Sequence, residues 1–192
     1  MTKTIRRDKD QYFTPDPLAF AMCRTLAAEL TPKTILEPSA GAGAFVCAAL
    51  DVWPHADITA IEPDPTYEVL HSGVDWHTST FEDWCDKDGA RGQHRRLRPD
   101  LVVGNPPYSM STEHLQLILK TCPASMVAML LPLNFLGSRC RAGMWRRLEK
   151  VMPIVPRPSF TGGKTDHCEY GMFLWGVAGI DPRSHSPIIW TK

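Results

Sequence analysis

A tetrad suited to holding an amine, Asn105-Pro106-Pro107-Tyr108, follows the apolar segment 100–104. The Asn105 side-chain oxygen and the Pro106 carbonyl accept hydrogen bonds, and the two prolines contribute no competing backbone N–H. Together they can hold both hydrogens of one NH₂ group, favour a pyramidal nitrogen and aim its lone pair at an electrophile. Tyr108 presents an aromatic face suited to stacking on a planar base. The structural alternative is a rigid turn with a packed tyrosine.

The glycine-rich segment 37–43, with the sequence EPSAGAG, is a candidate ligand loop. Small residues let the backbone turn tightly and let a ligand approach it closely. The segment lacks the third glycine of a dinucleotide-binding motif and the lysine of a P-loop, which argues against a phosphate ligand. Glu37 favours a cationic group instead, such as the ammonium of an amino acid. Tight packing would also explain the small residues.

Two further carboxylates follow expected strands. Glu62 ends the segment 57–62, a position where an acidic residue commonly accepts hydrogen bonds from ribose hydroxyls. A helix N-terminal acid is an equally good explanation. Asp83, in the segment 81–84, offers a carboxylate to an exocyclic amine, or caps a turn.

The elements that must position these residues alternate between strand and helix. We expect helices at 18–30, 44–52, 64–72, 111–121 and 138–150, and strands at 34–37, 57–62, 75–79, 100–104, 125–131, 151–155 and 168–177. This alternation predicts an α/β fold with a mostly parallel, doubly wound sheet, whose last two strands form a C-terminal antiparallel hairpin. Residues 1–10 are expected to be a flexible tail and 11–192 one domain.

The composition is that of a soluble globular protein. The chain has 192 residues, of which 43% are hydrophobic and 22% charged, which suits one α/β domain without a separate recognition domain. No apolar run is long enough for a membrane span or a secretory signal, so we expect no membrane association and a cytoplasmic protein. The six scattered cysteines predict free thiols and no metal site.

Charge is unevenly distributed although the net charge is zero. Residues 91–147 contain nine Lys or Arg against two Asp or Glu, a net charge of +7. A polyanion-facing surface needs such an excess, whereas a solvated helix face with a basic loop would also explain it. The candidate phosphate contacts are Arg95, Arg96 and Arg98 in the polar loop 85–99, together with the basic helix at 138–150.

These motifs resemble those of class I S-adenosylmethionine-dependent methyltransferases, and more narrowly of the DNA adenine-N6 methyltransferases, over nearly the whole chain. The resemblance implies a single-domain Rossmann-like methyltransferase fold with S-adenosyl-L-methionine as cofactor. It implies that the glycine-rich loop holds the methionine part of the cofactor, that Glu62 binds its ribose and that Asp83 meets its adenine. The loop residues concerned are Glu37, Ser39, Ala40, Gly41 and Gly43.

The tetrad resembles the catalytic motif of the same family. This implies that Asn105 and the Pro106 carbonyl hold the target N6, that Pro107 completes the turn and that Tyr108 stacks on the flipped base. Asn105 also borders the cofactor. The segment 11–15, QYFTP, is similar to the N-terminal cofactor motif of restriction-modification methyltransferases. That similarity adds Tyr12, Thr14 and Pro15 to the cofactor residues.

Near the C-terminus, the resemblance suggests an aromatic residue on the other face of the base. Phe160 is the candidate, although a core phenylalanine is an equally good explanation. Lys164, in the segment 161–164, could contact a phosphate.

The expected function is methyl transfer from S-adenosylmethionine to adenine N6 in DNA, by base flipping and direct transfer. The alternatives with the same chemistry are an RNA adenine-N6 and a protein glutamine-N5 methyltransferase. A noncatalytic binding subunit is a further alternative of another class. The expected partner is DNA, with RNA less favoured, and the protein would be a monomer or homodimer. The compact layout is similar to that of phage-encoded orphan enzymes, which would place it in a bacterial or host cytoplasm.

Overall fold

The structure is a computed structural model, and it describes residues 13–86, 98–160 and 168–176. The expected N-terminal tail and most of the expected loop 85–99 lie outside the described residues. Within the described part of the chain, no helix combines the length and apolar character that crossing a membrane requires.

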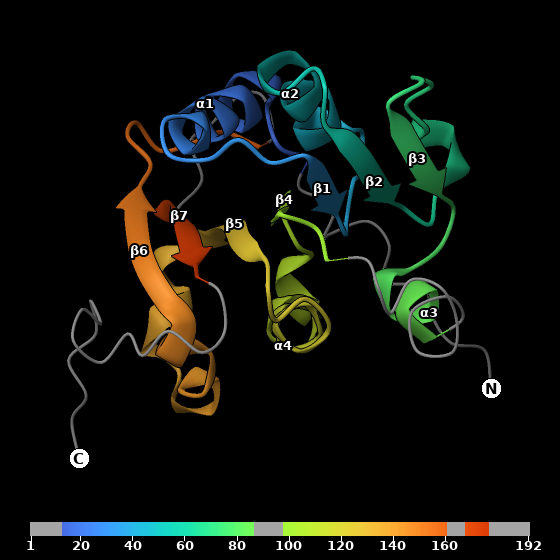
Figure 1. Ribbon diagram of the computed structural model, residues 1–192. Coiled ribbons are helices and arrows are strands. Elements are labelled where there is room, and N and C mark those ends of the chain that lie inside the picture. The colour runs from blue at the N-terminus through green and yellow to red at the C-terminus, as the bar shows by residue number, and fades with distance from the viewer. Residues whose placement is uncertain (1–12, 87–97, 161–167, 177–192) are drawn as a thin grey trace.

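In the described residues, one seven-stranded sheet forms the centre of the structure (Figure 1). Its strand order is β3-β2-β1-β4-β5-β7-β6. Strands β1 to β5 are parallel, whereas β7 runs antiparallel to both β5 and β6. This confirms the expected mostly parallel sheet with an antiparallel C-terminal pair. The strands are β1 (Thr34–Glu37), β2 (Asp57–Ile61), β3 (Val74–His77), β4 (Leu101–Gly104), β5 (Met126–Pro132), β6 (Leu148–Pro153) and β7 (Tyr170–Trp175).

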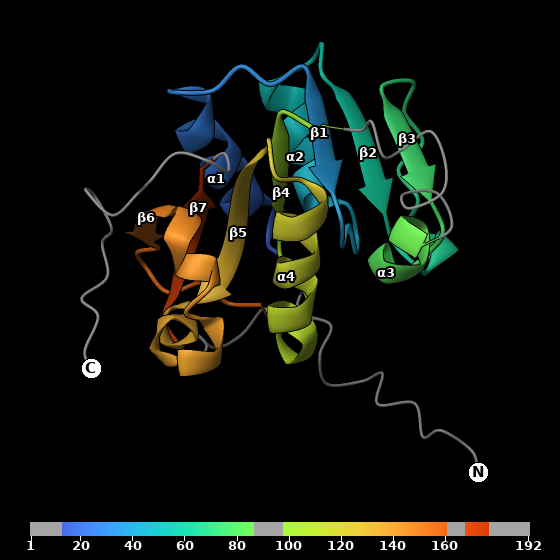
Figure 2. The same ribbon diagram turned by 60° about the horizontal axis from the view of Figure 1, so that its bottom comes forward.

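Helices cover both faces of this sheet (Figures 1 and 2). Helices α1 (Asp16–Ala27) and α2 (Ala44–Val52) lie on one face, and α3 (Phe81–Trp84) and α4 (Ser111–Thr121) lie on the other. Successive strand residues point to opposite faces, so β5 sends Ala128 and Leu130 into the core beneath α1 and α2. Its Met129 and Leu131 enter the core beneath α4. Burial on both faces explains why the central strands are apolar throughout.

Two expected helices are absent from the structure. Of segment 64–72, only Pro65–Tyr67 forms a 3₁₀ turn, because the Asp64 side chain accepts a hydrogen bond from Thr66 N and closes the turn locally. Segment 138–150 forms the 3₁₀ turns Arg139–Arg141 and Met144–Arg147 and then enters β6, where Leu148 pairs with Trp175. Pairing with β7 thus overrides the helical pattern. The single-turn helix α3 was not expected.

The neighbouring strands β1 and β4 form the switch point of the sheet, where the strand order reverses. Ligands of open α/β sheets bind at the carboxyl ends of the strands on either side of this point. The glycine-rich loop follows β1 and the tetrad follows β4. The topology therefore brings two motifs more than sixty residues apart to the same edge of the sheet.

Candidate active site

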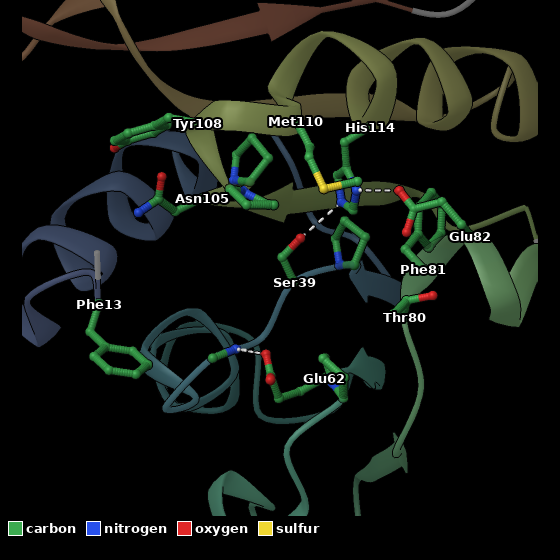
Figure 3. A pocket seen from close by; sticks show the side chains of 15 residues that line it. Phe13, Ser39, Glu62, Thr80, Phe81, Glu82, Asn105, Tyr108, Met110 and His114 are labelled. Carbon is green, nitrogen blue, oxygen red and sulfur yellow. Dashed lines mark hydrogen bonds and ion pairs between the residues drawn. The ribbon is translucent and has the colours of Figure 1, made fainter. Parts of the chain in front are cut away.

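A cavity of about 300 Å³ opens at this edge (Figure 3). A smaller one of about 60 Å³ lies beside it. Ser39, Gly41, Asn105 and Phe13 line both cavities. The larger one is also lined by Glu62, the rest of the tetrad, and three residues near the start of α3, namely Thr80, Phe81 and Glu82. Thr14, Glu37 and Ala40 line the smaller one.

The glycine-rich loop turns tightly, and its residues Ser39 and Gly41 line both cavities as their common floor. Gly41 and Gly43 have φ angles of +51° and +83°, a region that disfavours residues with a Cβ. A Cβ on Gly43 would also lie 2.5 Å from Val69 Cγ2. The loop is held by bonds from Ala40 N to Ile61 O and from Gly43 N to Ala40 O. Gly43 therefore shapes the loop and starts α2, and it lines neither cavity.

Glu62 ties the end of β2 to this loop. Its Oε2 accepts a hydrogen bond from Gly41 N over 2.9 Å, and its Oε1 accepts one from Asp64 N over 3.1 Å. The carboxylate is nearly buried and lines the larger cavity. It can accept further hydrogen bonds there from hydroxyl groups, because each carboxylate oxygen has two lone pairs.

Glu37 is a buried carboxyl at the end of β1, with only 2% of its surface exposed. Burial raises the pKa of Glu37 to about 8, and the nearby Glu62 raises it too, although the hydrogen bond from Ser39 N opposes this. The side chain lies over Gly104, where any Cβ would collide with the carboxylate. A cationic ligand group in the smaller cavity would favour the ionised form.

Asn105 directly follows β4 and is oriented by the N-terminal segment. Its Nδ2 donates a hydrogen bond to Thr14 Oγ1 over 3.1 Å. Because the amide nitrogen faces Thr14, the oxygen is turned the other way, toward the Tyr108 side of the cavity (Figure 3). Phe13 lies next to Thr14, and a Cβ on Gly41 would lie 3.3 Å from Cδ1 of its ring. Phe13, which the sequence did not single out, therefore also belongs to the site and lines both cavities.

Tyr108 belongs to a cluster of three aromatic rings. Its ring centroid lies 6.5 Å from that of Phe160 at an interplanar angle of 82°, and 5.7 Å from that of Tyr170. Phe160 in turn contacts Tyr170 edge to face at 4.9 Å. Phe160 therefore supports Tyr108 from the side and lies outside the cavity lining. Tyr170, at the start of β7, carried no signal in the sequence.

A hydrogen-bonded chain of three side chains forms another wall of the cavity (Figure 3). Ser39 Oγ lies 2.8 Å from His114 Nε2, and His114 Nδ1 lies 3.2 Å from Glu82 Oε1. The hydrogen bond from His114 lowers the pKa of Glu82. His114 is buried, with 3% of its surface exposed. No local motif predicts this chain, because its members lie on three separate elements.

The remaining expected site residues lie elsewhere. Asp83 is exposed and lines neither cavity, because Thr80 caps α3 by accepting from Asp83 N and the helix then points Phe81 and Trp84 inward. Pro15 starts α1. Arg98 is exposed before β4, at the strand end opposite to the tetrad. Tyr12, Arg95, Arg96 and Lys164 lie outside the described residues.

Only some of the arginines in the segment 138–150 are free to contact a nucleic acid. Arg147 donates hydrogen bonds to three backbone oxygens, those of Gly176, Leu119 and Ser125. Arg141 donates to Thr112 Oγ1 and Phe135 O, and its guanidinium lies 3.9 Å from the centre of the Phe135 ring. These two cations therefore join structural elements, whereas Arg139 and Arg146 are exposed.

The sheet order, the layers and the loop at the switch point define a Rossmann-like methyltransferase fold. A modification subunit of a putative type I restriction enzyme from Vibrio vulnificus YJ016 superposes with a TM-score of 0.66 at 14% identity, over 88% of this chain and 45% of that one. A putative RNA methyltransferase from Pyrococcus horikoshii superposes with a TM-score of 0.61 at 16% identity, over 88% of both chains. At these identities the likeness concerns the fold alone.

Sequence similarity connects the chain to type II methyltransferases. It is 31% identical over 103 residues to M.XamI from Xanthomonas campestris pv. amaranthicola, and 39% identical over 113 residues to M.AccI from Acinetobacter calcoaceticus. These matches cover 50% and 54% of this chain but only 19% of each relative. The chain thus matches about a fifth of the length of these curated relatives. No protein-family model matches it.

Proposed function

We propose that the chain transfers a methyl group from S-adenosylmethionine to the exocyclic N6 amine of adenine in DNA. The observation that carries this proposal is the position of Asn105-Pro106-Pro107-Tyr108 at the carboxyl end of β4, in the wall of a cavity whose floor is the glycine-rich loop. Similarity to type II methyltransferases supports the proposal independently.

The residues around the loop fit S-adenosylmethionine chemically. Gly41 leaves its part of the loop without a side chain, and its positive φ would strain any other residue at that position. The buried carboxyl of Glu37 suits an ammonium group, and the carboxylate of Glu62 suits hydroxyl donors such as those of a ribose. The bound cofactor would supply an electrophilic methyl group on a sulfonium.

In this proposal the tetrad acts on the amine. The Asn105 oxygen and the Pro106 carbonyl accept hydrogen bonds from its two N–H groups and aim the nitrogen lone pair into the cavity. The Tyr108 ring stacks on the base, and contacts with Tyr170 and Phe160 hold that ring in place. No covalent bond to the protein is required in this step.

DNA is proposed as the polymer because of the relatives' type II class and the positive charge of residues 91–147. The exposed Arg139 and Arg146 are available for phosphate contacts in the described part of this segment.

The test is nucleoside mass spectrometry of unmethylated duplex DNA, single-stranded DNA and bulk tRNA after incubation with the protein and S-adenosylmethionine. We expect N6-methyladenine in DNA, and its loss in Asn105→Ala and Tyr108→Ala, which should retain most of their cofactor affinity by calorimetry. Methylation of tRNA alone would replace DNA by RNA as the substrate. Cofactor binding without methylation of any of these polymers would contradict the proposal and direct the search to protein glutamine.

A further inference from the structure

The Ser39–His114–Glu82 chain is the polar feature of the cavity that the proposed chemistry leaves unused. It joins the loop after β1 to α4 and α3, and all three side chains line the larger cavity. The imidazole is held on a further side by the Phe81 ring, whose centroid lies 5.1 Å away. A buried ring with partners on both nitrogens has a fixed orientation, so its contacts with Ser39 and Glu82 are maintained together.

The chemistry of Glu82 sets the direction of the hydrogen bonds along this chain. Its pKa is lowered by the bond from His114, so the group is a carboxylate and can only accept. His114 Nδ1 must therefore carry a hydrogen. In the neutral imidazole the Nε2 atom is then an acceptor, and the Ser39 hydroxyl must donate to it.

We propose that His114 and Glu82 are positioning residues that keep the Ser39 hydroxyl hydrogen bonded to His114 Nε2. Ser39 Oγ then presents only lone pairs to the ligand. It therefore selects a hydrogen-bond donor, the ammonium of the cofactor's amino-acid part. This inference rests on the proposed use of S-adenosylmethionine. Its new element is the role of the two residues behind Ser39.

The surroundings of Ser39 favour an ammonium over a carboxylate at this position. The Ser39 N–H donates to Glu37 Oε1 over 2.9 Å, so the backbone donor of this residue is already engaged. Ser39 and Glu37 both line the smaller cavity. An ammonium group here would favour the ionised form of Glu37, and Ser39 Oγ and the Glu37 carboxylate would then form an acceptor surface for that cation.

The first experiment observes the imidazole in the protein without ligand. Long-range ¹H–¹⁵N spectra of histidine-labelled protein distinguish the two neutral tautomers and the imidazolium, and comparison with His114→Gln assigns the signal. We expect the Nδ1–H tautomer. An Nε2–H tautomer or an imidazolium would overturn the proposal, because Ser39 would then accept the hydrogen bond. This result does not depend on the proposed function.

The second experiment measures binding of S-adenosylhomocysteine and of methylthioadenosine, which lacks the amino-acid part. Ser39→Ala and His114→Ala should each weaken S-adenosylhomocysteine binding about tenfold, and the double variant no further, because one hydrogen-bonded chain is lost in every case. Methylthioadenosine affinity should change less than about twofold. His114→Gln places an acceptor near the Nε2 position and should restore most of the affinity.

The outcomes separate this inference from the proposed function. Suppose that the wild-type protein binds both ligands. If the affinity losses of Ser39→Ala and His114→Ala multiply in the double variant, or if these variants lose as much affinity for methylthioadenosine as for S-adenosylhomocysteine, the proposal on His114 is wrong while the proposed function stands. If the wild-type protein binds neither ligand, the proposed function and the cofactor role of Ser39 both fail. Thermal unfolding of each variant checks that its fold is intact.

Discussion

The amide of Asn105 donates a hydrogen bond to the hydroxyl of Thr14 over 3.1 Å, although the two residues lie 91 positions apart in the chain. The bond fixes the orientation of the amide, with its nitrogen toward Thr14 and its oxygen toward Tyr108 (Figure 3). The segment before α1 thereby orients the acceptor to which the proposed chemistry assigns the substrate amine. It joins the N-terminal motif directly to the tetrad.

Replacing Thr14 by valine should therefore slow catalysis more than it weakens cofactor binding. Thr14→Val removes the hydroxyl at nearly constant volume, and we expect the single-turnover methylation rate to fall about tenfold, the effect of one lost hydrogen bond. The cofactor Kd should change less than about threefold. Thr14→Ser is the control, since it keeps the hydroxyl. Equal rates in the valine and serine variants would show that the bond does not orient Asn105.

A side chain at position 104 should destabilise the fold. Gly104→Ala would push a Cβ into the Glu37 carboxylate, and we expect a loss of about 1–3 kcal/mol in urea unfolding. Gly137→Ala is the matched control, because a Cβ there meets no atom within 4 Å. In the double variant with Glu37→Ala, the loss of unfolding free energy should be smaller than the sum of the losses in the two single variants. Strict additivity would mean that the two side chains do not compete for space.

The raised pKa of Glu37 makes stability depend on pH. The unfolded chain releases this proton near its usual pKa of 4.5 and the folded chain near 8, so the folded state binds more protons in between. The free energy of unfolding should therefore fall as the pH rises from about 5 to 8. Glu37→Gln cannot ionise and should show a flatter profile in denaturant titrations. Parallel profiles for the two proteins would contradict the buried, protonated state.

Arg147 should contribute to stability through its three backbone acceptors. Arg147→Met leaves the carbonyls of Gly176, Leu119 and Ser125 without this donor, and we expect a loss of about 2–3 kcal/mol in unfolding free energy. The exposed Arg146, replaced by methionine, should change stability by less than about 0.5 kcal/mol. Equal losses of unfolding free energy in the two variants would contradict a structural role for Arg147.

Local sequence was sufficient for most of the secondary structure. The apolar runs at β1, β4 and β5 predict buried parallel strands. Such strands are covered on both faces, so their apolar character is visible in the local sequence without knowledge of the strands they pair with. The prediction of a helix over the basic segment 138–150 was wrong, because the structure of this segment depends on its pairing with a distant strand. Leu148 pairs with Trp175, and the guanidiniums of Arg141 and Arg147 find backbone acceptors that no local pattern reveals.

The sequence by itself determined the α/β class, the loop after β1 and the tetrad after β4, since each is a short contiguous motif at the end of an apolar strand. Only the tertiary structure decided that Thr14 orients Asn105, that Glu37 lies over Gly104, and that Glu82 rather than Asp83 faces the cavity. The chain from Ser39 through His114 to Glu82 belongs to the same group. These contacts exist because β1 and β4 are neighbours at the switch point, a relation set by the global packing of the sheet.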